Sequence, residues 1–210
     1  MQSDDPEALE RAIAIIKRGG VVAVPTETFY GLAADATHRI AVARIFEIKG
    51  RPASMALPLV AGSLQQVADL LGPIDAATAR AMKAFWPGPL SLVFAASPLL
   101  SGAAGEIDSR QTAADARTVA VRVPGHAFVR DLALGTGALL TSTSANRTGE
   151  PPAETAQAVA AALGDLVDLV IDGGATPGGK PSTIADLRGD TPRLVRDGAI
   201  AWSAVLESLQ

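Results

Sequence analysis

The sequence predicts an α/β fold: one twisted, mixed sheet, largely buried and flanked by helices. Short apolar runs rich in β-branched residues alternate with stretches in which apolar residues recur at helical spacing. Glycine and proline stand at most of the boundaries between them. The chain has 210 residues, 48% of them hydrophobic, and shows no repeat or interdomain linker, so we expect a single domain over 1–210.

The N-terminal elements are the clearest. Asp5 and Pro6 can start a helix that ends at the two glycines 19–20. Residues 21–24, closed by a proline, are typical of a buried strand, so the following segment is expected to be a loop at a strand end, where open α/β sheets commonly bind ligands. Helical spacing over 39–48 then stops at a glycine.

The remaining elements alternate in the same way, which favours an α/β domain. Further strands are predicted at 57–61, 90–95, 119–123, 138–140, 166–171 and 183–187, and helices at 63–70, 75–84, 126–134, 153–162 and 200–208. Two stretches, 97–117 and 172–181, are expected to be irregular. Long loops of this kind are either binding loops or surface decoration, and the sequence leaves both open.

Composition excludes several classes of protein. A net charge of −4 and a pI near 5.2 argue against a protein that coats nucleic acid. With no cysteine and only His38 and His126, the chain has no thiol nucleophile, thiolate metal site or three-histidine metal centre, and we predict no protein-bound metal. No apolar run reaches the roughly 18 residues of a membrane span, so we expect no membrane partner and a cytoplasmic location.

Two familiar catalytic patterns are poorly matched. Residues 174–180 fit a phosphate-binding G-x-x-x-x-G-K, but Pro181 stands where that motif needs Ser or Thr, and a strand follows instead of a helix. A mobile glycine-rich loop is the better interpretation. Serine nucleophiles lack a nearby histidine and a G-x-S-x-G elbow, although a triad with one of the two histidines stays open.

Cations and hydroxyls suited to a polyanion gather in two short pieces. Lys49 and Arg51 offer a point charge and a planar fork, and 142–146 offers hydroxyls and an amide, although a surface pair and a turn cluster are equally ordinary explanations. Arg122 lies inside a buried apolar run, so it either reaches solvent from an edge strand or faces a cleft that holds an anion or a carboxylate. Arg196 is similarly ambiguous.

These pieces, in this order, resemble the YrdC-type threonylcarbamoyl-AMP synthase family in its minimal, single-domain form, from about residue 8 to 200. Any one piece is weak, but eight in the correct order are hard to obtain by chance. They are 25–32 (PTETFYGL), 45–52 (IFEIKGRP), 86–90 (WPGPL), 121–124 (VRVP), 142–146 (STSAN), 172–174 (DGG), 181–184 (PSTI) and 195–198 (VRDG).

The resemblance implies a YrdC-like fold with a large concave, electropositive cavity and a reaction in which L-threonine, bicarbonate and ATP give threonylcarbamoyl-AMP and pyrophosphate. A separate transferase then modifies adenosine 37 of tRNA, so contact with tRNA would be indirect. Lys49 and Arg51 are the implied catalytic residues. The implied threonine contacts are Thr28, Arg122, Ser142 and Ser182, and the implied nucleotide contacts are Lys49, Arg51, Thr118, Ser144, Asn146 and Arg196.

Such a reaction needs preplaced cations more than a nucleophile, because negative charge accumulates on oxygens as pyrophosphate leaves. Mg²⁺ would be held mainly through the ATP phosphates. The loop 172–181 could close over the adenylate and exclude water.

The sequence departs from the family pattern at several positions. Some relatives carry Asn and His where this chain has Met55 and Val60, and Glu and Pro where it has Pro181 and Asp197. These departures keep open an alternative, a family paralogue that binds RNA or a nucleotide without making the adenylate. Carbamoyl transfer to a hydrogenase-maturation partner is disfavoured, because it normally accompanies paired cysteines that this chain lacks.

Overall fold

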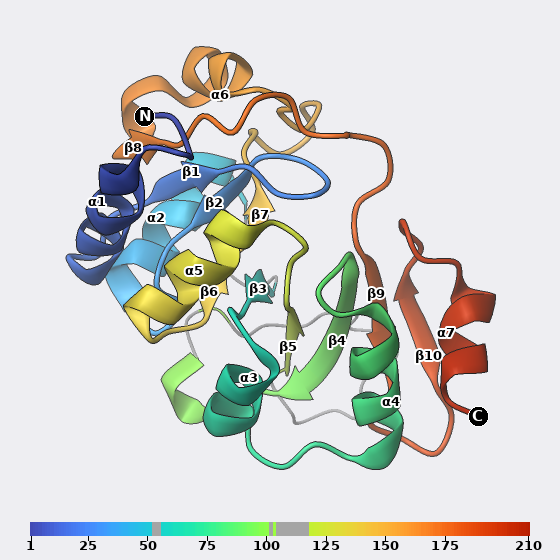
Figure 1. The fold of residues 1–210 in the computed structure, drawn as a ribbon. Coiled ribbons are helices and arrows are strands. Elements are labelled where there is room, and N and C mark those ends of the chain that lie inside the picture. The colour runs from blue at the N-terminus through green and yellow to red at the C-terminus, as the bar shows by residue number, and fades with distance from the viewer. Residues whose placement is uncertain (52–55, 101–102, 104–117) are drawn as a thin grey trace.

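The computed structural model describes residues 1–51, 56–100, 103 and 118–210, which form an α/β structure with two mixed sheets (Figure 1). The α-helices are α1 (Pro6–Lys17), α2 (Arg39–Lys49), α3 (Leu64–Leu71), α4 (Ala76–Phe85), α5 (Ala127–Thr136), α6 (Ala156–Leu163) and α7 (Trp202–Ser208), with 3-10 turns η1 (Pro98–Leu100) and η2 (Gly164–Leu166). The strands are β1 (Val22–Val24), β2 (Gly31–Ala33), β3 (Pro58–Val60), β4 (Leu90–Ala95), β5 (Thr118–Arg122), β6 (Leu140–Thr141), β7 (Thr143–Ser144), β8 (Leu169–Val170), β9 (Thr183–Asp186) and β10 (Arg193–Arg196).

The strands divide into a four-stranded sheet, β7-β2-β1-β8, and a six-stranded sheet, β10-β9-β4-β5-β3-β6. Parallel and antiparallel pairs occur in both. In Figure 1 the smaller sheet lies in the upper half with α1, α2 and α6, and the larger one in the lower half with α3, α4 and α7. The α/β class and the mixed pairing are confirmed, but the expected single sheet is corrected to two.

The segment from Leu140 to Ser144 changes sheets. Its first half, β6, pairs with β3, and its second half, β7, pairs with β2. Between them, the Ser142 amide donates to the Pro58 carbonyl at 2.8 Å. The Thr141 hydroxyl also donates to the Leu32 carbonyl at 2.8 Å, which ties the larger sheet to β2. The two sheets are therefore joined by one continuous segment of chain.

The predicted helices are confirmed, with ends shifted by a few residues at most. At α1, the Asp5 carboxylate accepts the Glu7 amide at 2.9 Å, and Pro6 occupies the first helical position. At α2, the cap is Gly50, whose φ of 59° lies in the left-handed region that glycine adopts readily. That ending makes Lys49 the last residue of a helix and turns the chain immediately after it.

The strand predictions are less complete. β2, β7 and β10 were not expected, and of the predicted strand over 166–171 only Leu169 and Val170 form a strand, β8, while Leu166 ends η2. β2 and β7 have only three and two residues, too few for a readable alternation of apolar and polar side chains. Met55 and most of the irregular stretch 97–117 lie outside the described residues.

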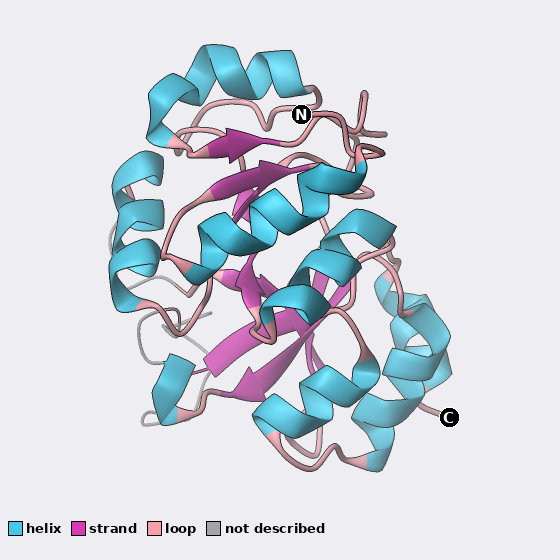
Figure 2. Ribbon diagram, turned by 60° about the vertical axis from the view of Figure 1, so that its left-hand side comes forward, coloured by secondary structure: helices cyan, strands magenta, loops and turns pink. Residues whose placement is uncertain are grey.

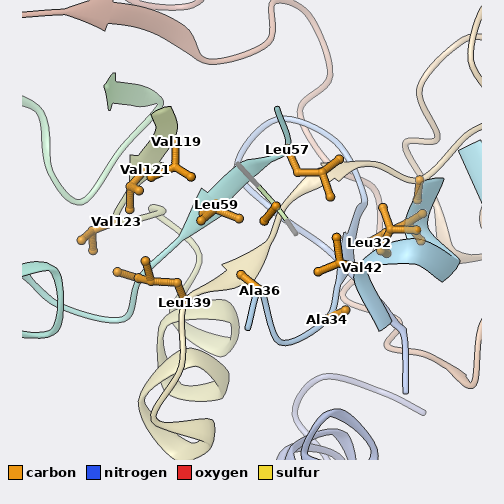
Figure 3. Packing of buried hydrophobic residues seen from close by; sticks show 14 of the residues in the cluster. Leu32, Ala34, Ala36, Val42, Leu57, Leu59, Val119, Val121, Val123 and Leu139 are labelled. Atoms are coloured by element: carbon orange, nitrogen blue, oxygen red, sulfur yellow. The ribbon is translucent and has the colours of Figure 1, made fainter. Parts of the chain in front are cut away.

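The main core cluster runs through both sheets. Leu32 of the smaller sheet and Leu59, Val121 and Leu139 of the larger sheet region belong to one buried cluster (Figure 3). Helices pack around the strands, which lie in the middle of the molecule (Figure 2). No helix in the described part of the chain is long and apolar enough to cross a bilayer. The strands of both sheets are held in place by this one continuous apolar core.

Candidate functional site

A cavity of about 710 Å³ opens where the two sheets meet. Its walls come from β2 and β7 of the smaller sheet, from β3, β5, β9 and β10 of the larger sheet, and from the end of α2. This volume lies within the range of about 300–1,000 Å³ common for small-molecule sites.

Nine of the ten site residues implied by the sequence line this cavity. They are Thr28, Lys49, Arg51, Arg122, Ser142, Ser144, Asn146, Ser182 and Arg196. The tenth, Thr118, is buried at the start of β5, pairs with Ala95, and is not among the lining residues. The fold therefore gathers residues that are up to 168 positions apart in the sequence, from Thr28 to Arg196.

Lys49 is buried against the piece that contains Ser144 and Asn146. Its ammonium donates to the Ser144 carbonyl at 2.7 Å and to Asn146 Oδ1 at 2.7 Å, with a longer contact to Ser144 Oγ at 3.3 Å. Burial and the neighbouring Arg51 charge lower the pKa of Lys49 from 10.5 to about 8. The amine is thus positioned by three acceptors, of which Ser144 Oγ is the most distant.

The low pKa of Lys49 predicts that anion binding in the cavity depends on pH. As the pH rises through about 8, the amine loses its proton and its attraction for an anion, so the dissociation constant for a polyphosphate should increase. Equilibrium binding measured between pH 7 and 9.5 checks this. Lys49→Arg should flatten the profile, because a guanidinium stays charged over this range. An equally steep profile in this variant would assign the titration to another group.

Arg122 lies on β5, an interior strand between β4 and β3, so the edge-strand alternative is wrong. Its side chain is only 7% exposed and forms an ion pair with Glu27 through Nη1 and Oε1. Burial and the nearby Arg196 charge lower the pKa of Arg122 to about 10. The other oxygen of Glu27, Oε2, is buried and has no hydrogen-bond partner among the described residues. Arg122 thus lines the cavity while it is paired with a carboxylate that is not part of the lining.

Arg196 approaches the cavity from β10. Its Nε and Nη2 donate to the Ser182 carbonyl at 3.0 and 2.7 Å, and Nη2 also donates to Ser182 Oγ at 2.8 Å. Burial and then the Arg51 charge lower the pKa of Arg196. Asp197 faces away from this group, because its carboxylate pairs with the exposed Lys180 at 2.9 Å. Asp197, although adjacent to Arg196 in sequence, therefore does not neutralise the Arg196 charge.

The described lining contains four cations and no aspartate or glutamate. Burial lowers the pKa of all four, and each of Lys49, Arg122 and Arg196 is further affected by the charge of another arginine of the cavity. Partly desolvated cations that repel one another are stabilised by an anion placed between them. The arrangement favours a ligand with several negative charges.

The loop 172–181 runs between β8 and β9 and contributes Gly179 and Pro181 to the lining (Figure 1). Tyr30 Oη donates to the Gly174 carbonyl at 2.8 Å and accepts the Gly173 amide at 3.1 Å. Burial raises the pKa of Tyr30, so its hydroxyl keeps the proton that it donates. The Gly178 amide donates to the Thr28 carbonyl at 2.9 Å. The glycine-rich loop interpretation fits this geometry, and no helix follows Lys180 to form a P-loop.

Tyr30→Phe should loosen this loop. Removing Oη deletes its hydrogen bonds to Gly173 and Gly174, two exposed residues to which water has access, so the free energy of unfolding should fall by about 0.5–1.5 kcal/mol. Urea denaturation measures the loss, and amide hydrogen exchange should accelerate between Gly173 and Gly178. Unchanged exchange in this segment would contradict the role assigned to Tyr30.

Sequence reasoning missed Glu27, although it lies inside the quoted piece 25–32. A buried arginine requires a counter-ion, and this signal could have identified Glu27. Neither histidine lines the cavity: His38 caps α2 and His126 precedes α5. The described part of the chain holds no cluster of three potential metal ligands among histidine, cysteine, aspartate and glutamate.

Comparison with known proteins was consistent with this geometry. The model of the Sua5/YciO/YrdC family, described as telomere recombination, matches residues 14–198. A Bacillus subtilis threonylcarbamoyl-AMP synthase is 36% identical over 200 residues, and one from Chromohalobacter salexigens is 38% identical over 187 residues. Among solved structures, Pyrococcus abyssi Sua5 complexed with L-threonine superposes with a TM-score of 0.83 at 35% identity, and Escherichia coli YciO with 0.76 at 27%.

The relatives differ in length. The matched part covers 95% of this chain but 56% of both the Bacillus and the Pyrococcus proteins. For the Chromohalobacter protein the matched part is 87% of this chain and 94% of the relative, and for the E. coli structure it is 91% and 89%. This chain therefore corresponds to the part that long and short relatives have in common.

Proposed function

The chain belongs to the Sua5/YciO/YrdC family, and from that membership we propose that it is a threonylcarbamoyl-AMP synthase. It joins L-threonine, bicarbonate and ATP, and releases pyrophosphate. The observation that carries the proposal is the cavity itself, which Lys49, Arg51, Arg122 and Arg196 line and whose described lining holds no carboxylate.

One end of the cavity suits an amino acid. Arg122 keeps Nε and Nη2 of its planar fork for a carboxylate, and Thr28, Ser142 and Ser182 add hydroxyls to the lining of the same cavity. Their support comes from the buried strand β5 and from the sheet crossing at Ser142. The Pyrococcus relative was solved with L-threonine, which supports threonine as the amino acid.

The other group of residues suits a nucleotide. Lys49 and Arg51 come from the end of α2, Ser144 and Asn146 from β7 and the turn after it, and Arg196 from β10. Two kinds of donor are thus available for phosphate oxygens, charged and neutral. Thr118, which the family resemblance implies as a further nucleotide contact, lies outside the lining, and we assign it no contact.

The chemistry requires no enzyme nucleophile. The threonine amine first condenses with bicarbonate to N-carboxythreonine, with loss of water. Its carbamate oxygen then attacks the α-phosphorus of ATP, the bond to the bridging oxygen breaks, and pyrophosphate leaves with the electron pair. Lys49 and Arg51 stabilise the charge that builds on the phosphate oxygens. Since the described lining has no carboxylate, Mg²⁺ would be held by the ATP phosphates, where it would neutralise part of that charge.

The product is a mixed anhydride that water would hydrolyse. The loop 172–181, tied to Tyr30 and Thr28, lies at the cavity and would limit access of water to the adenylate. The proposal also includes a single domain over 1–210, a cytoplasmic location and a separate transferase that receives the product for tRNA modification. Contact of this chain with tRNA would then be indirect.

Pyrophosphate release tests the proposal. Purified protein incubated with ATP, Mg²⁺ and bicarbonate should release pyrophosphate only when L-threonine is added, and L-serine should be a poorer substrate, because a buried methyl group contributes about 1 kcal/mol. Release that does not depend on threonine would refute the proposal. Salt-dependent RNA binding without any pyrophosphate release would instead support the non-synthesising paralogue.

A further inference from the structure

Ser91 is a buried hydroxyl directly behind the cavity. It lies on β4 between Leu90 and Leu92, is 1% exposed, and does not line the cavity. Its one hydrogen-bond contact among the described residues joins its Oγ to Ser182 Oγ at 3.0 Å. A hydroxyl placed between apolar strand residues is costly to bury unless it is paired, so this contact accounts for the position of Ser91.

The strand register places Ser91 on the cavity side of the sheet. It stands opposite Ile184 of β9, and Ile184 lines the cavity. Ser182 lies two residues before Ile184, and therefore on the same face of the sheet. Ser91 thus contacts Ser182, which lines the cavity, but does not line the cavity itself.

Hydrogen-bond chemistry restricts what Ser182 can do. A guanidinium has donors only, so Ser182 Oγ accepts the 2.8 Å bond from Arg196 Nη2. One acceptor site and one proton of Ser182 remain. If Ser91 donates to the remaining acceptor site, the Ser182 proton is free to point into the cavity. If Ser91 accepts instead, that proton is lost to the ligand.

We propose that Ser91 is a positioning residue, which donates to Ser182 when a ligand is bound and so holds the Ser182 hydroxyl as a donor aimed at the substrate carboxylate. This inference rests on the proposed synthase function. The result is a chain from Arg196, on the nucleotide side, through Ser182, on the threonine side, to Ser91.

Ser91→Ala should raise the KM for threonine about three- to tenfold, the effect of one lost hydrogen bond, and leave kcat within about twofold. Steady-state pyrophosphate release gives both constants. A matched pair of variants separates the effect of the hydroxyl from the effect of packing. Ser91→Thr retains the hydroxyl and should keep a KM for threonine near that of the wild type. Ser91→Val has the shape of the threonine variant without the hydroxyl and should behave like Ser91→Ala. This pair also serves if the alanine variant fails to fold.

A double-mutant cycle tests the route of the effect. In a Ser182→Ala background, Ser91→Ala should cause no further rise in KM, because the group that it positions is gone. Equal rises in both backgrounds, or a wild-type KM in Ser91→Ala, would overturn the proposal. A wild-type protein without threonine-dependent pyrophosphate release would refute the proposed function, whereas an active wild type with an unaffected Ser91→Ala variant would refute only the role of Ser91.

Discussion

Replacing Lys49 by alanine should reduce threonine-dependent pyrophosphate release by at least about a hundredfold, the usual cost of removing one group that stabilises charge in a transition state. Lys49 is buried and positioned by Ser144 and Asn146, so solvent cannot substitute for its charge. Because the interaction strengthens as pyrophosphate leaves, kcat should fall along with kcat/KM. Initial rates of pyrophosphate release, measured at saturating threonine with ATP varied, give kcat and the kcat/KM for ATP.

A matched control is Lys83→Ala. Lys83 lies in the last turn of α4, is exposed, and does not line the cavity. The control variant should retain the activity of the wild type. If Lys49→Ala were as active as Lys83→Ala, the cavity would not be the site of the reaction.

Arg122→Gln should abolish threonine recognition and destabilise the fold. The KM for threonine should rise by about a hundredfold or more, since a buried charged partner is lost. The free energy of unfolding should fall by about 3–5 kcal/mol, because the Glu27 carboxylate is left without its cation. Kinetics and urea denaturation measure the two effects separately.

The double variant Glu27→Gln, Arg122→Gln distinguishes the two roles. It removes both charges of the pair, so it should recover much of the lost stability and none of the threonine recognition. Arg80→Gln, an exposed arginine of α4, is the control for both measurements. Recovery of a low KM in the double variant would show that Arg122 supports the fold and does not bind the carboxylate.

Local sequence patterns predicted the elements that have strong periodicity. α2 ends at Gly50, whose left-handed conformation caps the helix, and β4 has the bounds expected from its mostly apolar run. β2 and β7 could not be found in this way. β2 pairs on one side with β1 and on the other with β7, and the two residues of β7 become a strand because Thr143 and Ser144 pair with Leu32 and Gly31, which are more than a hundred positions away.

The site could be assembled from sequence only through the family resemblance. Local reasoning left Arg122 between an edge strand and a cleft, and the pairing of β5 with both β3 and β4 decides between them. Likewise, Asp197 is adjacent to Arg196 in sequence, yet its carboxylate pairs with Lys180. Such choices depend on contacts between distant segments, which the order of residues along the chain does not reveal.

The measurement closest to the central claim is isotope transfer into the product. The protein is incubated with ¹³C-bicarbonate, L-threonine, ATP and Mg²⁺, and the mixture is analysed at once by mass spectrometry. The cavity predicts threonylcarbamoyl-AMP carrying a single ¹³C, formed in equal amount to pyrophosphate and reduced at least about a hundredfold with Lys49→Ala. Formation of ADP or AMP without a labelled adenylate would contradict the account.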